Sequence, residues 1–503
     1  MGEFISNHGM TYHLVTLGCQ MNKSDSERAR TVIEEMGYTW TDQEEEAQLM
    51  GILACSVRQK SIDKVYSRIY KWNSWKKQRN LLTFLSGCVL PADRAKFLKL
   101  FDLVFTMEEL PDLENMIGQY GVITPAVVVN RQQQIAQKPE PFDDEHQPDH
   151  HLIDLFEVTG KNEKTGGDVL KSLKSLRRNE LKLGKFWEIT PVYTSSFEAF
   201  VPIQNGCDKF CTFCAVPYTR GREVSRPSAE IFSEIKQLID DGYKSITLLG
   251  QNVNSYGRDK KDSEMTFKEL LEKIGQLCDS SGIEVWIYFT SPHPKDMTDD
   301  VIKVISQYKS LAKQIHLPIQ SGDDTVLKKM NRNHTVDKYR KIILSVRKYL
   351  PQSTIFTDII VGFTGETDEQ FENTRKIMEE FRYNMAYIAI YSPRPGAASS
   401  KWMDDIPQDI KKKRLHILSE ELKKYSSEHN RKMIGRNYKV LVTGKDRKEG
   451  YLSGYTEGRI IVRFPSDDTT LIGNFVNILI SSAADFSVEG VCQPVGEPEI
   501  TAR

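Results

Sequence analysis

The chain has 503 residues, with 68 Lys and Arg against 69 Asp and Glu and a formal net charge of −1 at pH 7. This length is enough for about three domains with separate cores, and the balanced charge excludes a chain that is basic throughout. A nucleic-acid partner would therefore need a locally basic face. The sequence has no apolar run of 18 residues and no leader-like start, which predicts a cytoplasmic protein that does not contact membranes.

The first 134 residues alternate between expected strands and helices. Strands are expected at 12–18, 47–54, 81–87 and 102–106, and this rhythm predicts an α/β fold with a doubly wound parallel sheet. Three cysteines come directly after the first three strands: Cys19, Cys55 and Cys88. Because ligands bind at the carboxyl ends of such strands, these side chains should meet at one edge. The alternative is three buried structural cysteines.

Residues 135–195 are expected to form a linker or insertion. Their stretch KPEPFDDEHQPDHH is polar and acidic and contains three prolines. This composition is typical of a connection between domains rather than of a packed core.

A second group of cysteines lies within eight residues in the spacing Cx3Cx2C: Cys207, Cys211 and Cys214. Thiolates are the ligands that [4Fe–4S] clusters prefer, and three of them would leave the fourth iron open. A zinc site would need a further Cys or His nearby, and none follows Cys214 locally. A disulfide framework is disfavoured because the number is odd. Phe213 completes the pattern CxxxCxΦC, in which Φ is aromatic. The spacing therefore predicts an open iron–sulfur cluster.

From residue 196 to 432 the strand–helix alternation resumes. Six repeats predict a partial (βα)6 barrel, in which an active site would lie at the carboxyl ends of the strands. Polar side chains follow several of the expected strands, and we expect them to line a cofactor and substrate site: Gln251, Asn252, Ser291, Gln320 and Ser321. The alternative for each is an ordinary cap at a strand end.

The C-terminal region is locally basic. Residues 408–450 carry 13 Lys and Arg against 6 Asp and Glu, a net charge of +7. Short alternating strands follow, and they predict a small antiparallel β-barrel over residues 433–503. Tyr451, Tyr455 and Arg459 are expected on its exposed surface, where they would contact RNA, with an affinity that depends on salt. The alternative is a charged helix that only faces solvent.

Several motifs resemble, in order, the methylthiotransferase family of radical S-adenosylmethionine (SAM) enzymes. The resemblance begins with TLGCQMNKSDSER, ILACSVR, SGCV and the Cx3Cx2C stretch. It continues through HLPIQSGDDTVLKKMNR, DIIVGFTGET and YSPRPGAA, and so covers nearly the whole chain. Ala54 replaces a usual Thr and Thr364 a usual Pro. Neither change removes an expected ligand.

The resemblance implies two [4Fe–4S] clusters and S-adenosyl-L-methionine as cofactors. Cys207, Cys211 and Cys214 would hold the cluster whose open iron binds SAM, and Cys19, Cys55 and Cys88 would hold an auxiliary cluster. Phe213 would contact the adenine of SAM, and the polar residues after the strands would complete the SAM and substrate wall. The N-terminal sheet would be the methylthiotransferase domain, the central barrel the radical SAM domain, and the small barrel an RNA-binding TRAM domain.

The resemblance also implies a transferase that modifies tRNA. CQMN and CTFCAVPYTRGREVSRP are most similar to members that add a methylthio group to C2 of N6-dimethylallyl(isopentenyl)adenosine beside the anticodon. That carbon offers no acidic proton, so a cofactor radical must activate it. The partners would be the tRNA anticodon stem-loop, a reductant such as flavodoxin or ferredoxin, and a sulfur donor. The alternatives are a relative that acts on threonylcarbamoyladenosine in tRNA or on a ribosomal-protein aspartate, and a non-catalytic iron–sulfur RNA-binding protein.

Overall fold

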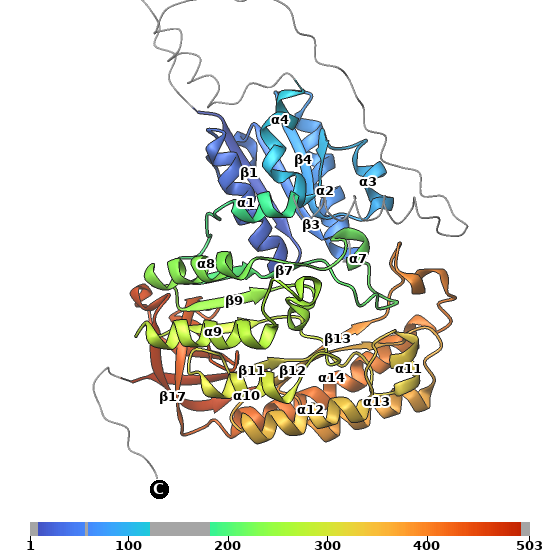
Figure 1. The fold of residues 1–503 in the computed structure, drawn as a ribbon, viewed down its shortest axis with the longest axis vertical. Helices are drawn as coiled ribbons and strands as arrows, with labels where there is room; N and C mark the ends of the chain where they lie inside the picture. Colours follow the sequence, from blue (N-terminus) through green and yellow to red (C-terminus); the bar gives the residue numbers. More distant parts are fainter. Residues whose placement is uncertain (1–8, 56–58, 121–181, 494–503) are drawn as a thin grey trace, which may run out of the picture.

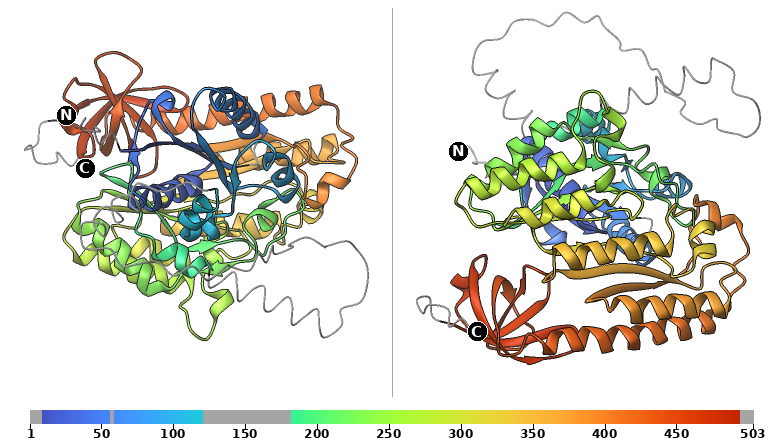
Figure 2. Two further views of the ribbon diagram at one scale, coloured as in Figure 1. Left: turned by 90° about the horizontal axis from the view of Figure 1, so that it is seen from above. Right: turned by 60° about the horizontal axis from the view of Figure 1, so that its bottom comes forward.

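The computed structural model describes residues 9–55, 59–120 and 182–493. They form a sheet above a larger barrel, with a small β-barrel packed beside that larger barrel (Figures 1 and 2). No helix in these ranges is long and apolar enough to cross a membrane. Most of the expected insertion at 135–195 lies outside the described residues. Its last part is helical at 182–188 and buries Leu183, Phe186 and Trp187 in the N-terminal core.

The N-terminal unit is a five-stranded sheet in the order β2-β1-β3-β4-β5, with every pair parallel. The expected doubly wound sheet is therefore confirmed, and the two-residue strand β2 is an addition. All seven residues of β3 are buried because helices cover both faces of the sheet. The elements are β1 (Thr11–Leu17), α1 (Gln20–Glu35), β2 (Thr39–Trp40), β3 (Leu49–Cys55), α2 (Gln59–Trp75), β4 (Leu82–Cys88), α3 (Pro91–Phe97), β5 (Leu103–Val104) and α4 (Leu113–Gly118).

The central unit confirms the expected partial (βα)6 barrel. Six parallel strands form two sheets, β10-β9-β6 and β11-β12-β13, and a parallel bridge between Ile287 and Leu311 joins them. An apolar core fills the space between these strands and the surrounding helices. The strands are β6 (Glu198–Pro202), β9 (Ser245–Leu249), β10 (Trp286–Phe289), β11 (Gln314–His316), β12 (Thr354–Val361) and β13 (Met385–Ile390), and the short pair β7 (Gln204–Asn205) and β8 (Val224–Ser225) follows β6.

Threonine side chains mark the beginnings of several barrel helices. Thr266 accepts the backbone N–H of Glu269, and Thr367 accepts that of Gln370, so each satisfies an N–H that has no partner within the helix. The helices of this unit are α7 (Val216–Thr219), α8 (Ser228–Asp240), α9 (Phe267–Ser280), α10 (Asp299–Gln307), α11 (Asp324–Lys329), α12 (Val336–Tyr349), α13 (Asp368–Phe381) and α14 (Gln408–Arg431).

Helix α14 leads from the central barrel to a closed five-stranded barrel (Figure 2). Four of its strand pairs are antiparallel, but β16 and β18 are parallel, so the barrel is mixed rather than wholly antiparallel as expected. The basic start of α14 is only partly exposed, because Lys411 pairs with Asp404 and Arg414 with Glu366 in buried positions. The strands are β14 (Asn437–Lys445), β15 (Tyr451–Thr456), β16 (Ile461–Pro465), β17 (Phe475–Ala483) and β18 (Ser487–Cys492).

Candidate active site

The cysteines after the N-terminal strands come together at one edge of the sheet. Cys55 and Cys88 are the last residues of β3 and β4 and lie opposite each other in register. Cys19 lies between β1 and α1, and β1 is the strand that pairs with β3 on the side opposite β4. From β1 the chain adds β2 on one side of the sheet and then β3, β4 and β5 on the other side. Doubly wound sheets bind ligands at such a switch point, which here lies between β1 and β3. We call Cys19, Cys55 and Cys88 the N-terminal triad.

Asn22 fixes the loop of Cys19 to the end of β3. Its side chain is fully buried, and Nδ2 donates to the carbonyl of Ala54 at 3.1 Å. Its Oδ1 lies 3.4 Å from Cys19 Sγ and 3.5 Å from Cys19 N. Gly87 has φ +99°, and a Cβ there would lie 2.5 Å from the Ala54 carbonyl oxygen. Sequence reasoning did not single out Asn22, although it belongs to the quoted CQMN motif.

The second group of cysteines, which we call the loop triad (Cys207, Cys211 and Cys214), lies on the loop after β7. Asn331 Nδ2 fixes this loop by donating to the carbonyls of Lys209 and Phe210, at 3.1 and 3.0 Å. The preceding Gly206 has φ +79°, and a Cβ there would clash with the Arg222 carbonyl oxygen. This conformation of the loop therefore requires glycine at position 206.

Three of the six thiols, those of Cys88, Cys207 and Cys214, have a raised pKa when no metal is present, which favours their neutral form. Burial raises the pKa of Cys207 to about 11 and that of Cys214 to about 12. A hydrogen bond with Cys55, together with burial, raises the pKa of Cys88 well above its usual value. Iron ligands must be deprotonated, so the positive charge of bound iron would have to stabilise these thiolates.

The donor sets fit iron–sulfur clusters better than a single metal ion. In the described part of the chain, no three His, Cys, Asp or Glu side chains form a group that could hold one ion. A [4Fe–4S] cube places each thiolate on a different iron, so its ligands need not converge on one point. Arg220 Nε donates to Cys88 Sγ at 3.0 Å, and Arg332 Nη1 donates to Cys211 Sγ at 3.6 Å. Each triad thus has one buried arginine that can stabilise a thiolate.

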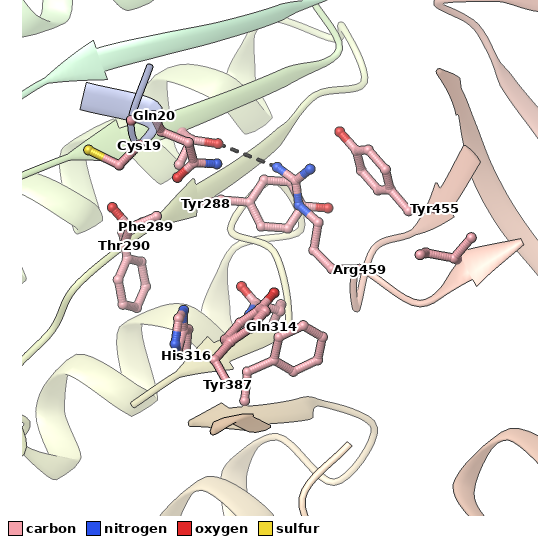
Figure 3. Close-up of a pocket in the computed structure, with 14 residues that line it drawn as sticks. Cys19, Gln20, Tyr288, Phe289, Thr290, Gln314, His316, Tyr387, Tyr455 and Arg459 are labelled. Atoms are coloured by element: carbon pink, nitrogen blue, oxygen red, sulfur yellow. Dashed lines mark hydrogen bonds between the residues drawn. The ribbon is translucent and has the colours of Figure 1, made fainter. Parts of the chain in front are cut away.

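A cavity of about 560 Å³ lies inside the central barrel, next to Cys19 (Figure 3). Six of its fourteen lining residues carry aromatic or imidazole rings. The rings of His316 and Tyr387 lie 5.6 Å apart, and His316 Nε2 lies 2.9 Å from Asp358 Oδ2. Gly18, Cys19 and Gln20 border it from the N-terminal sheet. The other lining residues are Thr247, Tyr288, Phe289, Thr290, Gln314, His316, Phe356, Tyr387, Tyr455, Arg459 and Ile461. We call this space the barrel cavity.

Tyr455 and Arg459 reach the barrel cavity from the small β-barrel. The guanidinium of Arg459 lies 3.9 Å from the ring centroid of Tyr288 and 4.1 Å from that of Tyr455. Its Nη2 also donates to Thr247 Oγ1 at 3.4 Å, which Figure 3 marks with a dashed line. The expectation that these two residues lie on an exposed face is wrong, because the central barrel covers them. Tyr451 is half-buried, with Lys448 Nζ 3.7 Å from its ring centroid.

Two of the polar residues expected to line the site lie beside the loop triad. Gln251 Oε1 accepts the N–H of Gly206 at 2.5 Å, one residue before Cys207. Asn252 is buried, and its Nδ2 donates to Ser255 Oγ at 2.6 Å. The buried Oδ1 of Asn252 and Oε1 of Gln204 have no hydrogen-bond partner among the described residues. Such orphaned oxygens fit the amino and hydroxyl groups of the expected SAM.

The remaining expected wall residues have local structural roles in addition to any contact with a ligand. Ser291 and Gln320 adopt left-handed backbone conformations, with φ +58° and +74°. Ser321 is buried, and its Oγ lies 3.4 Å from Thr374 Oγ1 on α13. Phe213 is half-buried, with its ring centroid 6.5 Å from that of Phe363. Their assignment to the SAM and substrate wall stays a prediction.

Comparison with known families matches each unit of the structure. The Radical SAM superfamily matches residues 201–378, Uncharacterized protein family UPF0004 matches residues 11–107, and the TRAM domain matches residues 431–492. Among solved structures, the radical S-adenosylmethionine methyltransferase TsrM from Kitasatospora setae has a TM-score of 0.44 and 10% identity. That alignment covers 92% of this chain and 80% of TsrM. We draw no functional argument from a similarity of this size.

Curated relatives match over almost the whole chain. The tRNA-2-methylthio-N(6)-dimethylallyladenosine synthase of Clostridium botulinum (strain Langeland / NCTC 10281 / Type F) is 36% identical over 482 residues, covering 95% of this chain and 96% of that protein. The protein of the same name from Cellvibrio japonicus (strain Ueda107) is 34% identical over 481 residues, covering 95% of each. The chain therefore belongs to the radical SAM methylthiotransferase family, whose enzymes combine these three domains and use a [4Fe–4S] cluster and SAM.

Proposed function

We propose that this enzyme adds a methylthio group to C2 of N6-dimethylallyladenosine next to the anticodon of tRNA. One observation carries the proposal: Cys19 of the N-terminal triad borders the same cavity that the radical SAM barrel encloses. A substrate atom in this cavity would meet both the radical chemistry of the barrel and a sulfur source at the N-terminal sheet. The relatives that match 95% of the chain carry this activity in their names.

In this proposal the two triads hold two [4Fe–4S] clusters. The loop triad would hold the cluster that binds SAM, and the N-terminal triad would hold the auxiliary cluster near the substrate. The first cluster supplies the one-electron chemistry that an unactivated aromatic C–H requires. Gln251, Asn252, Ser291, Gln320, Ser321 and Phe213 are proposed to surround SAM and the substrate. The orphaned oxygens of Gln204 and Asn252 support the SAM part of this assignment.

The barrel cavity is proposed to receive the target base. A base next to the anticodon is stacked on its neighbours, and moving it into a pocket costs a few kcal/mol. Stacking on an aromatic side chain returns about 1–3 kcal/mol per base, and Tyr387 is 54% exposed inside the cavity. Its neighbour His316 is oriented by Asp358 and offers the other ring nitrogen to the base. Arg459 and Tyr455 close the cavity on the side of the small barrel and limit access of water.

The reaction also needs partners that are not part of the chain. We propose a reductant such as flavodoxin or ferredoxin, a sulfur donor that replenishes the auxiliary cluster, and the cytoplasm as the location, where thiols remain reduced. The exposed Lys412 and Lys413 on α14 offer positive charge to the tRNA backbone, whereas Lys411 and Arg414 are buried in ion pairs.

The test is an anaerobic assay with reconstituted protein, SAM, a reductant and tRNA that carries N6-dimethylallyladenosine. Nucleosides from the digested RNA are analysed by mass spectrometry for the methylthio product. We expect product with the wild type and none above background with Cys207→Ala or Cys55→Ala. Cys492→Ala is the matched control, because this half-buried cysteine lies outside both triads, and it should retain activity.

Each outcome separates the competing functions. Release of 5′-deoxyadenosine without a modified nucleoside would keep the radical enzyme and remove this substrate. Tests on threonylcarbamoyladenosine tRNA and on ribosomal protein would then follow. Absence of 5′-deoxyadenosine from iron-loaded protein would instead favour a non-catalytic RNA-binding role.

A further inference from the structure

Arg220 belongs to the radical SAM domain but contacts a ligand of the other triad. It follows α7, which lies between the N-terminal sheet and the central barrel (Figure 1). Its side chain is buried, and Nε donates to Cys88 Sγ at 3.0 Å. Only five residues separate Arg220 from Cys214 of the loop triad. A single short segment therefore connects the ligands of the two triads.

A buried carboxylate balances the charge of Arg220. Asp25 on α1 is fully buried and accepts from both Nη1 and Nη2, the first at 3.4 Å. Asn205 Oδ1 accepts a further hydrogen bond from Nη1 at 3.3 Å. With these partners fixed, Nε points at the sulfur, and the guanidinium cannot turn away without leaving Asp25 unpaired. The contact with Cys88 is therefore held by buried partners of the guanidinium, whereas an exposed arginine could adopt many other conformations.

Arg332 makes the corresponding contact at the loop triad but is held differently. Its Nη1 lies 3.6 Å from Cys211 Sγ, and its Nη2 donates to the Pro318 carbonyl at 2.8 Å. Arg332 and Cys211 are both in the radical SAM domain, so this contact does not connect domains. The shorter contact at Cys88 crosses from one domain to the other and is balanced by a carboxylate.

We propose that Arg220 is a positioning residue that raises the reduction potential of the auxiliary cluster and fixes its place relative to the loop triad. This inference rests on the proposed function, because it requires a cluster on the N-terminal triad. One electron from a one-electron reductant makes a cluster more negative. A nearby positive charge and an N–H···S hydrogen bond both favour that reduced state. Asp25 has the opposite effect, since its negative charge disfavours reduction.

The test isolates the auxiliary cluster in the full-length chain. Cys207, Cys211 and Cys214 are replaced by Ala, and the reconstituted protein is titrated with dithionite while the reduced cluster is followed by electron paramagnetic resonance. Arg220→Met should lower the reduction equilibrium constant about tenfold, or about 59 mV for a one-electron couple. Asp25→Asn should shift the potential upward. Arg222→Met is the matched control, because this exposed neighbour pairs only with Asp208 among described charged groups and should not shift it.

Arg220→Met leaves Asp25 buried without its cation and can fail to fold for that reason. The double variant Arg220→Met/Asp25→Asn removes both charges together, and it should fold and still have a lowered potential, because the N–H···S bond is lost. Unchanged potentials, or shifts in the same direction for Arg220→Met and Asp25→Asn, overturn the inference. Absence of iron from the background protein overturns the two-cluster assignment of the proposed function and this inference with it.

Discussion

The two triads reach similar donor sets by different routes. The loop triad lies within eight residues and is shaped by one loop. The N-terminal triad draws on residues 19, 55 and 88, and only the order of strands in the sheet brings them together. Both have a glycine with positive φ directly before a cysteine, Gly206 and Gly87. The comparison shows that one site depends on local geometry and the other on the complete N-terminal fold.

Gly87→Ala should have the largest effect of the variants that separate the two triads, measured by unfolding free energy and iron content. A Cβ at φ +99° adds backbone strain and meets the Ala54 carbonyl oxygen at 2.5 Å, between the ends of β3 and β4. We expect the apoprotein to lose about 3 kcal/mol of unfolding free energy, measured by urea denaturation. The iron content of reconstituted protein should fall by about half, because only the N-terminal triad is disturbed.

Gly242→Ala is the matched control for strain without a clash. Gly242 has φ +83°, but no described atom lies within 4 Å of the place where a Cβ would stand, so a loss of only about 1 kcal/mol is expected. Gly206→Ala should reverse the pattern by removing iron from the loop triad instead. Equal iron loss from both triads in either variant would contradict the independence of the two sites.

Glu234→Gln tests an ion pair between the domains that carry the two triads. Glu234 on α8 pairs with Arg28 on α1 at 3.3 Å, and with Arg226. Both arginines are buried, and the Glu234 side chain is 11% exposed. Removing the carboxylate leaves the buried Arg28 guanidinium without its anion and leaves Arg226 with only the partly exposed Glu230, at a cost of about 3 kcal/mol. Glu230→Gln, one turn earlier and partly exposed, should cost less than about 1 kcal/mol. Urea denaturation of the apoproteins measures both.

The same carboxylate predicts a pH dependence. Burial alone would raise the pKa of Glu234, but Arg28 and Arg226 outweigh it and lower the pKa below its usual 4.5. The folded state therefore binds this proton more weakly than the unfolded state. The contribution of Glu234 is complete above about pH 4.5 and is lost as the pH falls toward the folded pKa. In the Glu234→Gln variant, the unfolding free energy should fall less between neutral and acidic pH than in the wild type. The same pH dependence in both proteins would contradict a lowered pKa for Glu234.

Tyr387→Ala should have the smallest effect, and it concerns the cavity rather than either triad. Loss of one stacking surface should raise KM for the anticodon stem-loop about fivefold to tenfold, which corresponds to about 1 kcal/mol. Iron content and unfolding free energy should change little, because the side chain is half-exposed. Tyr70→Ala, at an exposed position on α2 outside the cavity, should leave KM unchanged. A drop in kcat with constant KM would contradict a stacking role.

Strand periodicity predicts that Cys19, Cys55 and Cys88 lie at one edge of the sheet, and the structure places them there. The ligand role of both triads stays a prediction of the sequence. The sequence does not reveal the residues that support them. Arg220 is 132 residues from Cys88 and 195 from Asp25, so only the folded chain shows their contact. The sequence predicts an exposed face for Tyr455 and Arg459, because strand alternation cannot show that a neighbouring domain covers that face. Asn22 lies within the CQMN motif, but its hydrogen bond to Ala54 depends on the pairing of β1 with β3.

In the proposed two-cluster enzyme, the dispersed origin of the N-terminal triad also determines when iron can stabilise the chain. In an unfolded chain the three loop cysteines remain neighbours and can bind iron, which weakens the stabilisation that iron gives to the native state. Cys19, Cys55 and Cys88 form a site only after β1, β3 and β4 have paired. Iron bound there favours the folded sheet alone, so loading the auxiliary site should raise the unfolding temperature more than loading the loop triad.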